Sequence, residues 1–279
     1  MAAADGGVDL RQEHPHSARI YDYFLDGKDN YAVDREAAEA IERAIPSVRE
    51  VARGNRRFMQ RATGHLSEQW GVRQFLDIGT GIPTAPNLHQ VAQAAQPDAR
   101  VVYVDNDPLV LAHARALLVG TPQGRTRYVE ADLTTPQDIL ASVQVRETLD
   151  FSEPVALSLI AIAHFVPGDR IYELVDTLLE PLACGSFLVM THLTTDFATE
   201  MVEGTVAAYR GKGIAMEART RAGVARFFQG LEVLDPGIVP IEHWYPDTVE
   251  PAPGSNVTPL RSTASEPPAA GYAVVGRKP

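Results

Sequence analysis

The chain has 279 residues, of which 45% are hydrophobic and 22% are charged. This is the balance of an ordinary globular protein, and it excludes disordered and fibrous classes. The formal net charge of -11 repels phosphate backbones and argues against nucleic acid as the main partner. The longest apolar stretch, residues 155–166, is too short to span a bilayer, and the first residues lack a secretory signal. The sequence therefore predicts a cytoplasmic protein without a membrane segment, and it leaves the oligomeric state open.

The N-terminal part of the chain has helical patterns. Residues 15–41 are rich in aromatic side chains, and we expect them to form short helices around a turn. Ser47 followed by Glu50 has the spacing of a capping box and predicts the start of a longer amphipathic helix. We therefore predict an N-terminal helical extension, or cap, over residues 1–70 and a second, larger unit over residues 71–279.

The next part of the chain alternates between short apolar runs and helical patterns. The apolar runs, each a strand candidate, are residues 73–78, 100–104, 127–131, 155–163 and 186–191. The helical patterns between them are residues 84–95, 108–118, 136–143 and 169–182. Strands that alternate with helices predict right-handed crossovers and a parallel sheet that is buried on both faces. The expected fold class is therefore α/β.

The pattern changes near the end of the chain. Residues 220–230 predict one more helix. Residues 231–244 predict a strand region that is broken at residues 235–237, and residues 272–277 predict a final strand. The segment between these strands, residues 246–270, is rich in Pro, Ser and Thr, so no helix fits there. The last two strands are therefore expected to pair antiparallel, as a hairpin across a long loop.

A glycine motif follows the first strand candidate. The stretch DIGTG carries Asp77, Gly79, Thr80 and Gly81, and its glycines permit a sharp turn that lets the backbone approach a ligand at the carboxyl end of the strand. A dinucleotide fingerprint requires a third glycine where this chain has Thr84, which counts against NAD. An acid two residues before the first glycine suits an ammonium group better than a pyrophosphate.

Acidic residues also end the next two strand candidates. In VVYVDNDP, Asp105 can accept hydrogen bonds from both hydroxyls of a ribose, Asn106 can lie at the edge of an adenine, and Asp107 caps the following helix. In VEADL, Asp132 can accept from the adenine amino group while Leu133 packs on the ring. Taken alone, Asp132 is equally well a solvated strand-end residue. Together, the acids at three successive strand ends fit one adenosyl amino acid, so we predict S-adenosylmethionine as the cofactor and S-adenosylhomocysteine as its product.

The fourth strand candidate, VALSLIAIAHFV, brings His164 to the same edge of the sheet. This side chain has three alternative roles: general base, hydrogen-bond partner of the substrate, or a packed residue that bonds a backbone carbonyl. We take the general base as the catalytic hypothesis. His192 is expected to be structural. The sequence predicts no metal site, because no spacing of His, Cys and acidic residues completes a ligand set.

Several stretches resemble a known family, the actinobacterial S-adenosyl methyltransferases of largely uncharacterised function. They include ARIYDYFLDGKDNYAVDR, QFLDIGTGIPT, VVYVDNDPLVLAHARALL and HFVP, and the resemblance covers most of residues 18–192. It implies a Rossmann-like class I methyltransferase with a seven-stranded, mostly parallel sheet. It also implies cofactor contacts at Gly79, Gly81, Asp105 and Asp132, and it implies no particular acceptor.

The aromatic N-terminal stretch has the composition of a cover over a cofactor. Its polar and aromatic groups include Arg19, Tyr21, Tyr23, Asn30 and Tyr31, and we predict that Tyr23 and Asn30 contact the cofactor. The alternative is that the tyrosines pack as one face of an amphipathic helix while Arg19 pairs with an acid.

These observations predict a methyltransferase that moves a methyl group in line from S-adenosylmethionine to an unidentified small-molecule acceptor. Residues 194–217 are expected to form the other wall of the acceptor pocket. Two alternatives remain from sequence alone. One is a non-catalytic protein that binds S-adenosylmethionine or a partner, and the other is an NAD-dependent oxidoreductase.

Overall fold

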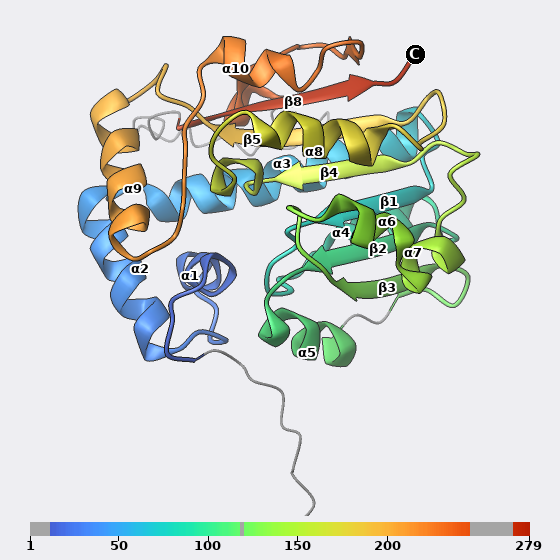
Figure 1. The fold of residues 1–279 in the computed structure, drawn as a ribbon. Coiled ribbons are helices and arrows are strands. Elements are labelled where there is room, and N and C mark those ends of the chain that lie inside the picture. Colours follow the sequence, from blue (N-terminus) through green and yellow to red (C-terminus); the bar gives the residue numbers. More distant parts are fainter. Residues whose placement is uncertain (1–11, 118–119, 246–269) are drawn as a thin grey trace, which may run out of the picture.

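The computed structural model describes residues 12–117, 120–245 and 270–279, and its centre is a mixed β-sheet (Figure 1). The strands are β1 (Gln74–Ile78), β2 (Arg100–Asp105), β3 (Arg125–Glu130), β4 (Ala156–Ile160), β5 (Phe187–Leu193), β6 (Glu232–Val233), β7 (Val239–Pro240) and β8 (Gly271–Arg277). Their order across the sheet is β3-β2-β1-β4-β5-β8-β6, and β7 also pairs with β8. The first five strands are parallel, whereas β8 runs antiparallel to β5, β6 and β7.

Helices connect and cover these strands. They are α1 (Ser17–Phe24), α2 (Ala32–Ala44), α3 (Val48–Gln69), α4 (Leu88–Ala95), α5 (Pro108–Leu117), α6 (Pro136–Ala141), α7 (Val143–Thr148), α8 (Arg170–Leu179), α9 (Thr199–Gly211) and α10 (Arg221–Arg226). Two 3-10 turns are η1 (Ala163–Phe165) and η2 (Ile241–His243). Within the described residues, none of the helices is both long and apolar enough to cross a membrane.

The α/β alternation predicted from sequence is confirmed, with small differences at element ends. Residues 231–244 form two short strands on either side of a turn at residues 235–237, where the sequence predicted a break. Within the described residues the sheet has eight strands, where seven were expected. The antiparallel pairing of the C-terminal strands is confirmed. Most of the predicted long loop, residues 246–269, lies outside the described residues.

Two helices begin or divide where side chains offer a cap. The helix expected from residue 84 begins only at Leu88, where Asn87 and Gln90 form a capping box. The helix expected over residues 136–143 ends at Ser142, whose hydroxyl accepts from the amide of Val145 and starts α7. The predicted start of α3 after residue 47 is confirmed, although the Ser47 side chain makes no capping bond.

Side chains of the sheet alternate between two faces, because successive residues of a strand point to opposite sides. Leu76 and Ile78 of β1 pack with helices α6, α7, α8 and α10. The side chain of Phe75 points to the opposite side of the sheet, where it packs with α3 and α4. Figure 1 shows α8 in front of the sheet and α3 behind it. The sheet is therefore the middle layer of three, as its apolar strands require.

Helices α1, α2 and α9 form a cap beyond the carboxyl ends of the parallel strands (Figure 1). They share an apolar cluster of buried residues that includes Ile20, Phe24, Ile41 and Tyr209. Helix α3 contributes to this cluster near its start and to the core of the sheet along its remaining turns. The boundary predicted at residue 70 coincides with the end of α3 at Gln69, and the division into two units stays a prediction.

Candidate functional site

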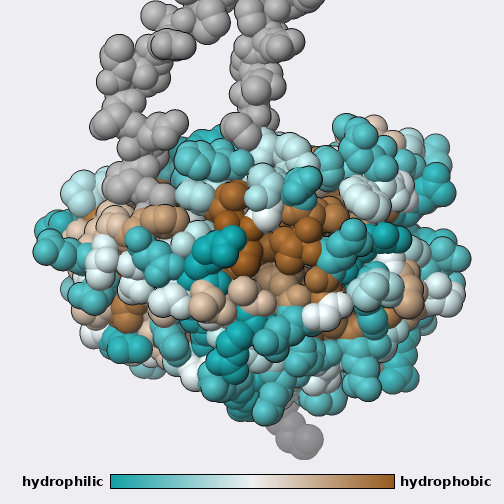
Figure 2. Space-filling view, turned by 90° about the horizontal axis from the view of Figure 1, so that it is seen from above, coloured by the Kyte–Doolittle hydropathy of each residue, from teal (hydrophilic) through white to brown (hydrophobic). Residues whose placement is uncertain are grey.

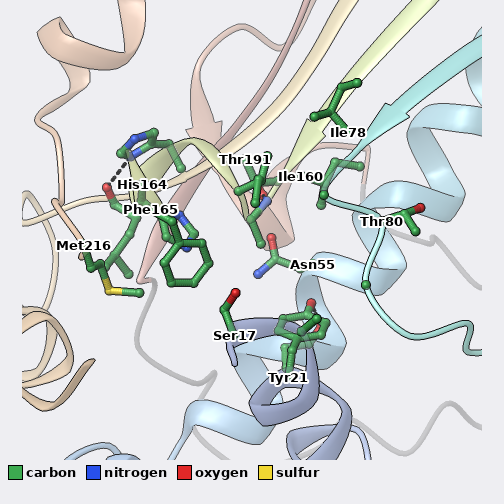
Figure 3. A pocket seen from close by; sticks show the side chains of 18 of the residues that line it. Ser17, Tyr21, Asn55, Ile78, Thr80, Ile160, His164, Phe165, Thr191 and Met216 are labelled. Carbon is green, nitrogen blue, oxygen red and sulfur yellow. Dashed lines mark hydrogen bonds between the residues drawn. The ribbon is translucent and has the colours of Figure 1, made fainter. Parts of the chain in front are cut away.

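A cavity of about 310 Å³ lies at the carboxyl ends of β1, β2, β3 and β4, under the cap (Figure 3). This volume falls in the range of small-molecule sites. Nine residues predicted from sequence line it: Asp77, Gly79, Thr80, Gly81, Asp105, Asn106, Asp132, Leu133 and His164. Figure 3 shows Thr80 toward one end of the cavity and Met216 toward the other, with Asn55 between them. We call these two ends the glycine end and the Met216 end.

The glycine end is built on a turn in the left-handed region. Gly79 has φ +72° and Gly81 has φ +67°, a conformation that residues with a Cβ rarely adopt. The amide of Gly79 donates to the carbonyl of Val104 at 2.8 Å, which ties the turn to β2. A Cβ at Gly79 would lie 2.5 Å from Ile162 Cγ1, whereas a Cβ at Gly81 would meet nothing within 4 Å. The space beside Gly81 is therefore open to a ligand.

Asp77 ends β1 on the cavity side of the sheet. Its Oδ2 accepts a hydrogen bond of 2.5 Å from the Thr80 hydroxyl. Burial raises the pKa of Asp77 to about 6, and the hydrogen bond from Thr80 and the charge of Arg56 offset only part of that effect. A buried carboxylate that lacks a full counter-ion favours a cationic ligand, which would restore its ordinary ionisation.

Asp105 ends β2 and is held by the backbone of both neighbouring turns. Its Oδ2 accepts from the Gly81 amide at 2.8 Å and its Oδ1 accepts from the Asp107 amide at 3.0 Å. Burial raises its pKa, and these two amide bonds oppose the rise. A carboxylate offers about four acceptor sites, so two hydroxyl donors can still be accommodated on a fixed, buried acid.

Asp132 follows β3 and faces the same cavity. Its Oδ1 accepts from the amide and hydroxyl of Thr134 at 2.7 and 2.6 Å, and its Oδ2 accepts from Asn106 Nδ2 at 2.7 Å. Partial burial raises the pKa of Asp132, but the bonds from Thr134 and Asn106 outweigh it and leave the pKa lowered. Leu133 is buried beside it. These three hydrogen bonds leave about one free acceptor site on the Asp132 carboxylate, next to the apolar side chain of Leu133.

The N-terminal helix α1 docks on this end of the site. Asp107 accepts from the Leu109 amide at 3.0 Å and so caps α5, as predicted. The same carboxylate lies 3.2 Å from His16 Nδ1 and 3.5 Å from Arg19 Nε. Arg19 is buried and also pairs with Asp34 at 3.3 Å. The alternative in which the arginine pairs with an acid is therefore the one observed.

Two predicted cofactor contacts are not placed at the cavity. Asn30 donates to Asp22 Oδ2 at 2.8 Å and to the Gly27 carbonyl at 3.1 Å, so its amide holds the turn after α1. Tyr23 lies under the Arg49 guanidinium, 4.7 Å from ring centroid to Cζ. Neither residue is in the cavity lining, and their contact with the cofactor stays a prediction. Helical periodicity explains their placement, because residues 17, 21 and 24 share the face of α1 that lines the cavity.

His164 lies in η1, at the Met216 end, with an exposed fraction of 8%. Its Nδ1 has no hydrogen-bond partner within the described part of the chain, and its ring centroid lies 5.7 Å from that of His192. Burial lowers the pKa of His164 well below its usual value, and electrostatic repulsion by His192 and Arg219 lowers this pKa further. The imidazole is therefore neutral at physiological pH, with a lone pair available as a base or acceptor.

His192 is held in one tautomer by its two neighbours. Its Nδ1 donates to the Leu193 carbonyl at 2.7 Å, so its Nε2 accepts from Arg219 Nη1 at 3.0 Å. Burial lowers the pKa of His192 to about 4. Arg219 also donates to the Gly168 carbonyl at 2.7 Å. This supports the structural role expected for His192, which positions Arg219 and packs beside the ring of His164.

Several lining residues were missed from sequence. They are His16, Ser17, Asn55 and Arg56. For Asn55 a signal existed, because this polar residue interrupts the apolar stripe of α3 that runs through Val48, Val51 and Met59. Asn55 Nδ2 donates to the Val51 carbonyl at 3.3 Å, and its buried Oδ1 has no partner within the described residues. The segment predicted as the other wall, residues 194–217, supplies Thr205, Tyr209 and Met216.

The donor and acceptor set at the glycine end fits an adenosyl amino acid. Asp77 suits an ammonium group, Asp105 suits paired hydroxyls, and Asp132 with Leu133 suits an amino group on a flat ring. The open space at Gly81 admits the backbone approach that such a ligand needs. Helix α4 begins at Leu88, seven residues after the second glycine. A pyrophosphate site requires a helix N-terminus directly after the turn, and this site lacks one.

Comparison with known proteins gives the same assignment. The family model described as S-adenosyl methyltransferase matches residues 4–279. The crystal structure of a DUF574 family protein from Streptomyces avermitilis MA-4680 is 46% identical, covers 97% of this chain and 100% of that chain, and has a TM-score of 0.90. A crystal structure from Thermobifida fusca YX is 37% identical over 99% of both chains, with a TM-score of 0.84. No curated protein matches.

A more distant likeness concerns the fold alone. The structure of an O-methyltransferase family protein from Burkholderia thailandensis is 14% identical, covers 96% of this chain and 65% of that chain, and has a TM-score of 0.52. The family model spans nearly the whole chain, and its description agrees with the donor set found at the glycine end. The chain belongs to the S-adenosyl methyltransferase family and is a methyltransferase that uses S-adenosylmethionine as its cofactor.

Proposed function

We propose that the glycine end holds S-adenosylmethionine and that the Met216 end holds a small-molecule acceptor. In this assignment Asp77 binds the ammonium group, Asp105 binds the ribose hydroxyls, and Asp132 with Asn106 and Leu133 binds the adenine. The observation that carries the proposal is the convergence of three strand-end carboxylates on one cavity beside an open glycine turn. The enclosed volume of about 310 Å³ supports a small acceptor better than a nucleic acid.

When bound, the cofactor supplies a methyl group on a sulfonium, and an acceptor oxygen or nitrogen takes that methyl in line while the electron pair of the broken bond stays on sulfur. The protein's part is to orient the two reactants and to exclude water. For a hydroxyl acceptor, the neutral imidazole of His164 takes the released proton. Because the pKa of His164 is lowered, its imidazole is neutral at pH 6.5 and above, and it stays neutral as the pH falls further below 6.5 than for an exposed histidine.

Isothermal titration with S-adenosylhomocysteine and with NAD tests the cofactor assignment. We expect binding of the first ligand only. Asp105→Ala should weaken S-adenosylhomocysteine binding by about 1 to 3 kcal/mol, since charge-assisted bonds to the ribose are lost. As a matched control, Asp169→Ala removes an exposed carboxylate that pairs with Arg226 on the surface and should leave the affinity unchanged. Equal affinities for the wild type and a folded Asp105→Ala protein would remove the ribose assignment.

A second measurement addresses the chemistry at His164. His164→Ala should retain cofactor affinity and lose turnover with a hydroxyl acceptor, because the variant lacks the base. His164→Gln keeps a polar side chain of similar reach and should lose turnover as well. Full turnover in either variant would show that the side chain only packs against Phe165, 4.5 Å away between ring centroids.

A further inference from the structure

The Met216 end of the cavity is uncharged, and this bears on the acceptor that the proposed function leaves open. Its lining includes Phe165, Thr205, Tyr209 and Met216, together with His164. Burial raises the pKa of Tyr209, so its phenol stays protonated, and His164 stays neutral because burial lowers its pKa. Among the described residues that line this end, none therefore carries a formal charge at neutral pH.

The acids and the arginine of the lining belong to the opposite end. Asp77, Asp105 and Asp132 are the strand-end acids. Arg56 donates to the carbonyls of the segment between the glycine turn and α4, at 2.8 Å for one of them. The buried Arg219 lies behind this end, but it already pairs with Glu217 and donates to the carbonyls of Val166 and Gly168. A charged group bound at the Met216 end would thus be desolvated with no counter-ion among the described lining residues, which is unfavourable.

Apolar side chains supply most of the remaining surface at the Met216 end. Phe165, Leu193 and Met216 belong to the same cluster as the buried residues of α1, α2 and α9, and Phe165 packs on Tyr209 with 5.6 Å between ring centroids. Figure 2 shows, for the face seen from above, apolar residues gathered near the centre with hydrophilic residues around them. An apolar ligand body at the Met216 end would exclude water with little loss of hydrogen bonds.

Two polar atoms near this end lack partners within the described residues. They are Asn55 Oδ1 and His164 Nδ1, and both side chains are at least nine-tenths buried. A carbonyl oxygen can only accept, and a neutral imidazole has one nitrogen that accepts. Buried polar atoms in native proteins are nearly always bonded. His164 lines the cavity, so a ligand with an O–H donor against its ring would supply a partner for the accepting nitrogen, and the same hydrogen is the proton released on methyl transfer.

We propose that the acceptor is an uncharged, largely apolar molecule with a hydroxyl group, which is methylated on oxygen. Its apolar body lies at the Met216 end, and its hydroxyl donates to His164. In the transfer, the oxygen–methyl bond forms as the methyl–sulfur bond breaks, the electron pair of the latter stays on sulfur, and the hydroxyl proton moves to the imidazole. The total charge is conserved, because the positive charge of the sulfonium is replaced by that of one imidazolium. This inference rests on the proposed function.

Isothermal titration of matched probes into protein saturated with S-adenosylhomocysteine tests the inference. The probes are 2-naphthol, naphthalene, 2-naphthoate and the 2-naphthylmethylammonium ion, which share a ring system and differ in charge and hydroxyl. We expect 2-naphthol to bind at least tenfold more tightly than either ion and severalfold more tightly than naphthalene. An ion that binds as tightly as 2-naphthol, or no binding of 2-naphthol at all, would overturn the proposal.

A charge placed at the Met216 end should reverse the order of affinities. Met216→Lys adds a cation to this wall and should make 2-naphthoate bind at least tenfold more tightly than it does to the wild type. Met216→Leu is the matched control and should keep the wild-type order. Unchanged ranking in a folded Met216→Lys protein would contradict the inference. If that variant does not fold, the wild-type ranking decides alone.

The first titration, with S-adenosylhomocysteine, separates the two levels of the argument. If the cofactor product does not bind, both the proposed function and the acceptor class are wrong. If it binds and the charged probes are preferred, only the acceptor class is wrong. Formation of S-adenosylhomocysteine from S-adenosylmethionine with 2-naphthol, and its loss in His164→Ala, would then show that the bound hydroxyl is the methyl acceptor.

Discussion

Replacing Asp77 with asparagine should stabilise the cofactor-free protein while it weakens the binding of the cofactor. The carboxylate is buried, with an exposed fraction of 9%, and burial raises its pKa from 3.8 to about 6. Asparagine has nearly the same shape, and its Oδ1 can still accept the hydrogen bond that Thr80 donates at 2.5 Å. The substitution therefore removes a desolvated charge without opening a cavity.

The magnitude follows from the shift in pKa. A rise from 3.8 to about 6 is roughly two units, and at 1.36 kcal/mol per unit the ionised form costs the native state about 3 kcal/mol. Because the folded pKa is the higher one, the native protein binds the extra proton, and stability falls as pH rises from about 4 to about 6. Above pH 6 the full cost is present. The variant lacks this cost, so its advantage should grow across that window and then stay constant.

Urea denaturation of the two proteins from pH 4 to pH 8 measures this difference directly. The free energies of unfolding should converge near pH 4 and differ by about 3 kcal/mol at pH 7.5. In the same pair, Asp77→Asn should weaken S-adenosylhomocysteine binding by about 1.5 to 3 kcal/mol, since a charge-assisted bond to the ammonium is lost. A variant less stable than the wild type at pH 7.5, or one with unchanged affinity, would refute the reasoning.

Three further predictions concern the turn, the cap and the histidine. Gly79→Ala should lower the free energy of unfolding by more than Gly81→Ala, because both acquire a strained φ but only the first meets another side chain; denaturation curves of both variants check this. Arg19→Met leaves two acids buried without their cation and should cost about 3 to 5 kcal/mol of stability at pH 7.5, and a loss under 1 kcal/mol would contradict that role. In an NMR titration, the His164 ring should stay neutral from pH 8 to below pH 6.5; a midpoint at or above 6.5 would contradict the account of its burial.

The sheet could be predicted from sequence because each parallel strand is a compact apolar run between helical patterns. The acids that end β1, β2 and β3 then had to meet, since carboxyl ends of parallel strands lie at one edge. The C-terminal region was harder. Its strands β6 and β7 have two residues each, so neither shows a period, and only their pairing with β8 defines them.

The cap was the part least visible in sequence. Tyr23 and Asn30 have the chemistry of ligand contacts, yet one packs under Arg49 and the other holds a turn. Which face of α1 meets the cavity depends on tertiary packing against α2 and α3, which composition does not encode. Asn55 shows the opposite case. Its position on an apolar stripe of α3 is a local inconsistency, and such inconsistencies tend to mark functional sites.

A crystal structure of the protein with S-adenosylhomocysteine tests the central claim most directly. The account predicts the ribose hydroxyls within hydrogen-bond distance of Asp105, the amino acid ammonium beside Asp77, and the adenine against Leu133. It also predicts that the sulfur faces the Met216 end. A ligand bound outside this cavity, or one in which the carboxylates of Asp77 and Asp105 contact only protein atoms, would contradict it.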